Sequence, residues 1–101
     1  MKSIPLNLKK RILSLDATDF QKKVWIAAAS IPRGETRSYG WIARAVGRPL
    51  ACRAVGNALN RNPLAPSVPC HRVIAASGKI GGFALGPETK RRLLKAEGIS
   101  I

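Results

Sequence analysis

The chain lacks the features that mark membrane, secreted and disulfide-stabilised proteins. No apolar run approaches the roughly 18–20 residues that a membrane-spanning helix needs. The N-terminal residues are charged, but no long apolar segment follows them, which argues against a secretory signal. Two cysteines, Cys52 and Cys70, are too few for a disulfide framework and favour a reduced setting. We therefore expect an intracellular, cytoplasmic protein.

Acidic residues are also scarce. Five Asp and Glu face 18 Lys and Arg, so the 101-residue chain carries a net charge of +13 with its single His neutral. Such a charge on so small a body attracts polyanions, because each phosphate that is neutralised releases a condensed counterion. We expect nucleic acid as the partner. Charge alone does not separate DNA from RNA, and a solvated basic surface is the simpler alternative.

Internal repeats, low-complexity tracts and interdomain linkers are missing as well, so the length fits one domain. A hydrophobic content of 46% excludes a disordered basic tail. Residues 1–17 fit a short helix or a strand equally well, because leucines and an isoleucine interleave there with basic residues.

Three helices are predicted in the first 60 residues, over 19–30, 39–46 and 49–60. Thr18 and the residues after it have the spacing of a capping box. Ser38 can cap the second helix and Gly47 can end it, while Pro49 suits the first turn of the third. Two short helices joined by a Gly-Arg-Pro turn indicate a helix-turn-helix.

The third helix has two different faces. Its polar face carries, next to Gly56, the residues Arg53, Asn57 and Asn60. Its apolar face carries Ala51, Val55, Ala58 and Leu59. A polar face with small neighbours suits a helix that enters a DNA groove, because bulky side chains would hold its backbone away. An ordinary amphipathic surface helix fits the pattern equally well, and the net charge favours DNA.

Beyond Asn62, three prolines at positions 63, 66 and 69 exclude a helix. A short strand is predicted over 73–75, with a returning strand at Ile80. Residues 81–86 form a glycine-rich loop without the context of a nucleotide-binding fingerprint, and a final helix follows over 87–97. The predicted fold class is mainly α with a small β element, a winged-helix-like, helix-turn-helix DNA-binding domain.

The segment Pro-Cys-His-Arg-Val at 69–73 is the most informative string for chemistry. Cys70 lies between a proline-stiffened loop and a strand, where a thiol is held but reachable, and a basic field would favour its thiolate. In an extended chain His71 points to the opposite face, so a bridging water would have to relay the proton. Glu97 is one of few acids able to orient the imidazole. A buried structural Cys and His are the simpler alternative.

A metal site is not expected. Cys52, Cys70 and His71 offer at most three soft ligands, and the chain has no C-x-x-C pair.

The string at 69–73 resembles the active-site signature of O6-alkylguanine-DNA alkyltransferases. The resemblance runs from Phe20 to Gly98 and includes Ser-Tyr at 38–39, Arg-Ala-Val-Gly at 53–56 and Arg-Asn-Pro at 61–63. It implies a helix-turn-helix domain over 18–101 that binds the minor groove, preceded by a short extension over 1–17. That extension is too short for the separate N-terminal domain that members usually have, and a metal bound there in some members has no counterpart.

The resemblance also implies roles for individual residues. Cys70 accepts the alkyl group, His71 takes the thiol proton through a water, and Glu97 holds the imidazole. Asn62 braces the turn after the recognition helix. Tyr39 assists rotation of the base and donates a hydrogen bond to guanine, unless it is a plain aromatic packed against the first helix.

The remaining implied contacts are with DNA and with the flipped base. Arg53 fills the space that the extruded base leaves in the stack. The implied DNA-binding residues are Arg53, Tyr39, Ala51, Asn57 and Asn60. The implied substrate pocket consists of Val73, Phe83, Ala84 and Trp41. Many members have tyrosine in place of Phe83 and serine or arginine in place of Ala84, which makes this pocket more apolar.

Transfer to a thiol implies a single turnover, because a thioether has no carbonyl carbon for water to attack. The implied function is irreversible repair of O6-alkylguanine in double-stranded DNA by a monomer without a cofactor. The alternative is an alkyltransferase-like lesion sensor, which generally has tryptophan where this chain has Cys70. A plain helix-turn-helix or RNA-binding module would leave the string at 69–73 unexplained.

Overall fold

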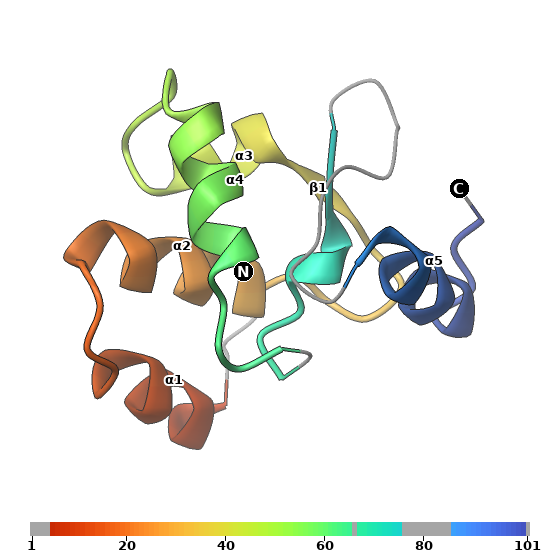
Figure 1. The fold of residues 1–101 in the computed structure, drawn as a ribbon, viewed down its shortest axis with the longest axis horizontal. Helices are drawn as coiled ribbons and strands as arrows, with labels where there is room; N and C mark the ends of the chain where they lie inside the picture. The colour runs from red at the N-terminus through yellow and green to blue at the C-terminus, as the bar shows by residue number, and fades with distance from the viewer. Residues whose placement is uncertain (1–4, 66, 76–85, 101) are drawn as a thin grey trace.

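The computed structural model describes residues 5–65, 67–75 and 86–100. In chain order (Figure 1) their elements are α1 (Leu6–Leu13), α2 (Asp19–Ala29), β1 (Arg37–Ser38), α3 (Tyr39–Ala45), α4 (Cys52–Asn60), a 3-10 turn η1 (Cys70–Arg72), β2 (Val73–Ile74) and α5 (Pro87–Ala96). The predicted fold class, mainly α with a small β element, is confirmed. Among the described residues, no helix is both long enough and apolar enough to span a bilayer.

Two of the predicted helix starts are capped as the sequence indicates. Thr18 Oγ1 accepts from the Gln21 amide at 3.1 Å, and the Gln21 side chain accepts from the Thr18 amide at 3.0 Å. Ser38 Oγ accepts from the Trp41 amide at 3.0 Å. Gly47 follows the end of α3 with φ +78°, a conformation that glycine adopts without strain.

The predicted start of the third helix at Pro49 is wrong, because α4 begins at Cys52. The Ala51 amide donates to the Arg48 carbonyl at 3.0 Å, which closes a turn around Pro49. The chain needs these residues to reverse direction between α3 and α4. Ala51 therefore lies at the N-cap of α4 rather than within its first turns.

Residues 1–17, for which both a helix and a strand fitted, contain α1. Ile12 is its buried residue and belongs to the same core as α2, α3 and α4. The division into a short extension over residues 1–17 and a domain over residues 18–101 stays a prediction.

The core lies where α2, α3 and α4 meet. Its buried residues on these helices are Val24, Trp25, Ala28, Ile42, Ala43, Val55, Ala58 and Leu59. The Trp25 indole donates to the Ala58 carbonyl at 2.8 Å, so α2 and α4 are joined by a hydrogen bond as well as by packing. The predicted helix-turn-helix thus consists of α3 and α4, and α2 packs against both of these helices.

The two strands pair in parallel, with Arg37 opposite Val73 and Ser38 opposite Ile74. The strand predicted over 73–75 is confirmed for Val73–Ile74, but its partner β1 was not predicted. The returning strand expected at Ile80 and most of the loop over 81–86 lie outside the described residues.

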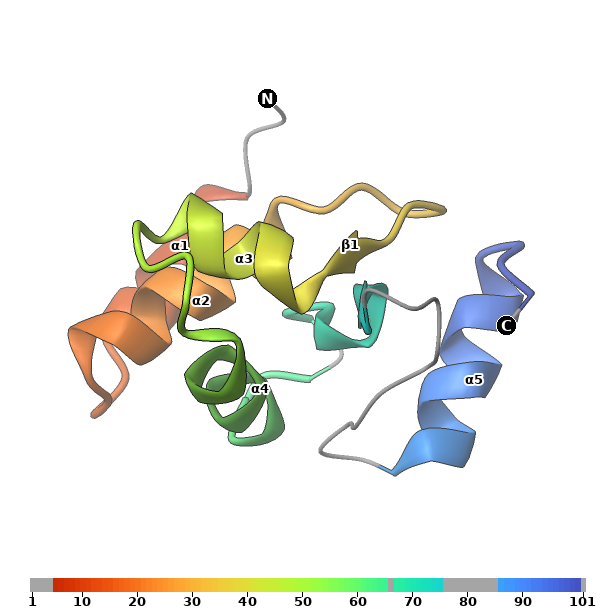
Figure 2. The same cartoon turned by 90° about the horizontal axis from the view of Figure 1, so that it is seen from above.

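Helix α5 stands apart from the group α1–α4, and η1 and β2 lie between them in both views (Figures 1 and 2). It begins at Pro87, as predicted, and ends before Gly98, which has φ +82°. This arrangement puts the Pro-Cys-His-Arg-Val string between the helix-turn-helix and the last helix.

Candidate active site

Cys70 lies in η1, immediately after the proline-rich loop, and it is 2% exposed. Its sulfur is 3.3 Å from the side-chain nitrogen of Asn62, which donates to it. The expectation of a reachable thiol is therefore wrong for this structure. Val68 and Pro69 are buried together with Cys70, so this part of the chain turns into the core instead of running along an edge.

Cys70 and His71 do not lie in extended chain. The Cys70 amide donates to the Val68 carbonyl at 2.8 Å, and the Arg72 amide donates to the Pro69 carbonyl at 2.9 Å. In this tight turn the alternation of side chains between two faces does not apply, and both Cys70 and His71 are buried.

His71 contacts Glu97, the residue at the C-cap of α5. The distance from His71 Nε2 to Glu97 Oε2 is 2.7 Å, and the two side chains are 4% and 5% exposed. Glu97 also accepts from Arg72 Nε at 2.9 Å and from the Gly34 amide at 3.0 Å. The carboxylate thus joins η1, α5 and the loop after α2.

The charge of this carboxylate is well stabilised. Burial would raise the pKa of Glu97, but hydrogen bonds from Arg72, His71 and Gly34 outweigh it and lower the pKa to about 2. Arg72 is fixed in turn by donating to the Ile31 carbonyl at 2.7 Å. An ionised Glu97 accepts the Nε2 proton of His71, which makes Nδ1 the basic nitrogen of a neutral ring.

Burial lowers the pKa of His71, and the hydrogen bond to Glu97 offsets this only in part. The imidazole is therefore neutral near pH 7, the form in which it can accept a proton.

The thiol of Cys70 is in its neutral form at rest. Burial raises the pKa of Cys70, and the opposing effects of the Asn62 hydrogen bond and the Lys90 charge do not cancel it. The expectation that the basic field leaves the thiol more ionised than usual is therefore wrong, because desolvation outweighs that field. Any nucleophilic step at Cys70 needs a base to remove the proton.

Asn62 connects the end of α4 to the thiol. Its side-chain nitrogen donates to the Val68 carbonyl at 2.9 Å as well as to the Cys70 sulfur, and its side-chain oxygen accepts from the Leu64 amide at 2.9 Å. This buried asparagine therefore joins the end of α4 to the loop before η1 and to η1 itself.

Lys90 is a site residue that the sequence interpretation missed. It lies on α5 and is completely buried, and its ammonium donates to the Val73 carbonyl at 2.6 Å. The same ammonium lies 5.8 Å from the centre of the Tyr39 ring. No local signal marks it, because it is one cation in a helix rich in cations.

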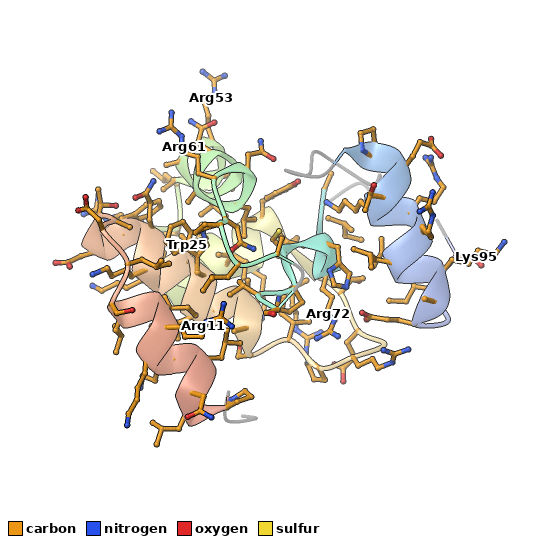
Figure 3. The ribbon with its side chains drawn as sticks, turned by 60° about the horizontal axis from the view of Figure 1, so that its bottom comes forward. Arg11, Trp25, Arg53, Arg61, Arg72 and Lys95 are labelled. Carbon is orange, nitrogen blue, oxygen red and sulfur yellow. The ribbon has the colours of Figure 1, made fainter. Side chains whose placement is uncertain are left out.

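The residues predicted on the polar face of the third helix, now α4, are confirmed as exposed: Arg53, Asn57 and Asn60. Arg53 projects away from the body of the protein, as does Arg61 beyond the end of α4 (Figure 3). Ala51 is half-buried at the N-cap of α4.

A groove runs along one side of α4, with an accessible volume of about 280 Å³. It is lined from α4 and from the start of α2 by Thr18, Phe20, Gln21, Ala54, Asn57, Ala58 and Arg61. Arg48, in the turn before α4, lies over the Phe20 ring at 5.5 Å. The groove between α4 and the start of α2 is thus bordered by two arginines, Arg48 and Arg61.

The residues predicted for the substrate pocket fall into two groups. Val73 is buried in β2, two residues after His71. Trp41 is half-buried on α3, and the Arg37 guanidinium lies 5.4 Å over its ring. Phe83 and Ala84 lie outside the described residues.

Helix α4 is linked to the Cys70 thiol through Asn62, which follows the end of the helix. Arg53 is near the start of α4 and Asn62 follows its end, a separation of roughly 14 Å at 1.5 Å per residue. Because Asn62 donates to the Cys70 sulfur, the end of α4 lies next to the thiol. Within the described part of the chain, no three His, Cys, Asp or Glu side chains gather as metal ligands would.

Comparison with known proteins agrees with this geometry. The family model for the DNA-binding domain of 6-O-methylguanine DNA methyltransferase matches residues 19–99. A methylated-DNA–protein-cysteine methyltransferase of Methanosarcina acetivorans is 58% identical over 86 residues, which are 85% of this chain and 55% of that protein. The chain spans about half the length of the curated relatives it matches.

Solved structures of related proteins are also similar in fold. The Mycobacterium tuberculosis OGT in complex with DNA has a TM-score of 0.81 and 56% identity, covering 84% of this chain and 52% of that one. The S. pombe Atl1 in complex with damaged DNA containing O6-carboxymethylguanine has a TM-score of 0.75 and 35% identity, covering 86% and 82%. The resemblance found in the sequence is confirmed, and the chain belongs to the family of the 6-O-methylguanine DNA methyltransferase DNA-binding domain.

Proposed function

We propose that this protein repairs O6-alkylguanine in double-stranded DNA by moving the alkyl group to its own Cys70. The observation that carries the proposal is the arrangement around the sulfur. Asn62 donates to it from the end of the recognition helix, and the next residue, His71, is paired with an ionised Glu97. A nucleophile, a base and a group that orients the base are what a displacement by a neutral thiol requires.

The reaction is an in-line displacement at the alkyl carbon. A carbon–sulfur bond forms as the bond from carbon to guanine O6 breaks, and the electron pair of that bond stays with guanine. The thiol proton leaves through a water to His71, which Glu97 stabilises as it becomes positive. Guanine takes up one proton, so the products are an S-alkylated protein and an unmodified base.

Access to the sulfur depends on the DNA. Cys70 is 2% exposed, so the site has to open on its substrate side when the guanine enters. We infer that α4 lies in the minor groove, with Asn57, Asn60 and Ala51 close to the DNA, and that Arg53 replaces the extruded base in the stack.

The guanine would then meet Tyr39 and Val73. In the proposed complex the Tyr39 hydroxyl donates to the base as negative charge develops, and the carbonyls of Cys70 and Val73 accept from its amino group. We infer that Trp41 borders the same pocket, together with Phe83 and Ala84 from outside the described residues.

The proposed reaction ends with the protein spent. Water does not cleave a thioether, and the displacement needs no cofactor. Action as a monomer, in a compartment where DNA is accessible, stays part of the proposal.

The second candidate is a lesion sensor that binds alkylated guanine without accepting the alkyl group. The similarity to Atl1, whose structure contains damaged DNA, favours it. Cys70 favours transfer, since a sensor has no need of a nucleophile paired with a base. Incubation with a duplex containing O6-methylguanine, followed by peptide mass spectrometry, separates the two. We expect a methylated Cys70 peptide, whereas tight binding of the lesion with unmodified protein would establish the sensor.

We expect Arg53→Ala to slow repair of duplex DNA by about 10- to 100-fold, because unstacking the target base costs a few kcal/mol that Arg53 helps to offset. Transfer from the free base O6-methylguanine, which needs no unstacking, should change less than twofold. Rates on the two substrates are measured from methylated protein against time.

Arg11→Ala on α1 is the matched control, since it removes one exposed positive charge away from α4. If Arg53→Ala lowers the rates on duplex and free base equally, Arg53 does not act in the DNA stack.

A further inference from the structure

Leu50 is the most exposed large hydrophobic side chain among the described residues. It is 99% exposed, against 64% for Leu6 and 50% for Leu13 on α1. It lies in the turn between α3 and α4, two residues before α4 begins, at the outer edge of the molecule in Figure 1. Single apolar side chains are common on protein surfaces. The position and the surroundings of Leu50 therefore matter more than its exposure.

The backbone around Leu50 is well held. The Ala51 amide donates to the Arg48 carbonyl at 3.0 Å, so Pro49 and Leu50 are the central residues of a closed turn. The ring of Pro49 fixes its own φ angle, and the Arg48 guanidinium lies 5.5 Å from the centre of the Phe20 ring of α2. The turn thus presents the leucine to solvent in one orientation, and contact with a partner costs little conformational freedom.

The surroundings of this turn are cationic. No Asp or Glu occurs in residues 36–87, so the helix-turn-helix contains no acidic side chain. Its charged residues are Arg44, Arg48 and Arg53, and all three are exposed. A partner that covers Leu50 therefore has to combine apolar surface with negative charge. The minor groove of DNA combines both, because deoxyribose rings wall it and phosphates border it.

We propose that Leu50 is a further DNA-contacting residue, whose side chain packs against the deoxyribose wall of the minor groove next to the start of α4. This inference rests on the proposed function for the placement of α4 in that groove. Leu50 lies three residues before Arg53, at the same end of the helix, so the contact continues the proposed DNA-binding face of α4. Leucine is one of the apolar residues with which proteins contact the minor groove.

The proposed contact differs from those of the arginines in its response to salt. A cation that neutralises a phosphate releases a counterion, so its contribution to affinity falls as the salt concentration rises. Burial of an apolar side chain releases no counterion. Leu50 should therefore add affinity for DNA that stays at high salt.

A second copy of this chain is the other partner that an exposed leucine could contact. The charges argue against it, because such a contact brings the arginines of two helix-turn-helices together. One leucine also buries much less surface than a stable dimer needs.

The test is the dissociation constant of the full chain for an unmodified DNA duplex, measured by fluorescence anisotropy at several salt concentrations. We expect Leu50→Ser to weaken binding by about tenfold at every salt concentration, because the burial of an apolar side chain is lost. The slope of log Kd against log salt should stay parental, since no charge is removed. Leu50→Met keeps the apolar surface and should bind within about threefold of the parental protein.

Leu6→Ser is the matched control, since it makes the same chemical change at an exposed leucine of α1. Its dissociation constant should be parental. Thermal unfolding verifies that each variant is folded, which the exposure of both leucines favours.

Four outcomes would overturn the inference. The first is an unchanged dissociation constant in Leu50→Ser, and the second is an equal loss in Leu6→Ser. The third is a Leu50→Met variant that binds as weakly as Leu50→Ser. The fourth is a parental protein that sediments as a dimer while Leu50→Ser sediments as a monomer with parental DNA affinity, because Leu50 then joins two copies.

The duplex in this assay contains no lesion. The assay therefore separates the inference from the proposed function, which fails only if the parental protein takes no methyl group from a lesion.

Discussion

Cys70→Ala is expected to abolish alkyl transfer completely while the protein still binds a duplex containing O6-methylguanine. Alanine provides no nucleophile, and His71 and Glu97 have no thiol proton to remove. The smaller side chain leaves a small gap and removes the contact from Asn62, which costs about 1–2 kcal/mol of stability and leaves the fold intact. Transfer is followed by mass spectrometry and binding by fluorescence anisotropy of the same duplex.

Cys52→Ala is the matched control for Cys70→Ala. Cys52 is exposed on the first turn of α4, so its removal should leave transfer to Cys70 in place. Methylated protein from Cys70→Ala, or a loss of transfer only in Cys52→Ala, would show that the acceptor has been misassigned.

Glu97→Gln should have the second largest effect, on stability and on rate together. The pKa of Glu97 is about 2 in the folded protein against an ordinary value of 4.5, so its charge contributes about 3 kcal/mol above pH 4.5. This contribution is lost as the pH falls from 4.5 toward 2, because protonation then favours the unfolded chain. Urea unfolding between pH 2 and 7 should show this loss of stability in the parental protein. Glu97→Gln should not show it, because its free energy of unfolding is already lower by about 3 kcal/mol at pH 7.

The same substitution should slow methyl transfer by about 100-fold, since a glutamine amide does not stabilise the positive form of His71 as a carboxylate does. Glu88→Gln is the control on α5, where Glu88 pairs with Arg91 in an exposed (i, i+3) bridge worth at most about 0.5 kcal/mol. A Glu97→Gln variant with full stability and full rate would remove Glu97 from the site.

Much of the helical frame could be predicted because its signals are local. The capping box at Thr18, the Ser38 cap and Gly47 each act within one turn of helix, so spacing alone identifies them. The faces of α4 followed from its 3.6-residue period, and burial confirms them. The turn at Pro49 was misassigned because proline suits both a tight turn and the first turn of a helix.

The details of the site depend on contacts between distant segments, which no local pattern specifies. β1 consists of two residues and exists through its pairing with β2. The burial of Lys90 depends on how α5 packs against η1 and β2, and the two residues that follow it, Arg91 and Arg92, are basic and exposed. Desolvation of Cys70 likewise follows from tertiary packing, so the direction of its pKa shift was predicted incorrectly.

The most direct measurement of the central proposal is a titration of the protein with increasing amounts of an O6-methylguanine duplex, with intact mass and peptide mapping at each point. We expect one methyl group per protein, located on Cys70, with guanine restored in equal amount and no further repair once every molecule is methylated. Protein that stays unmodified at excess lesion, or repair that continues beyond one equivalent, would contradict the assignment of Cys70 as an irreversible acceptor.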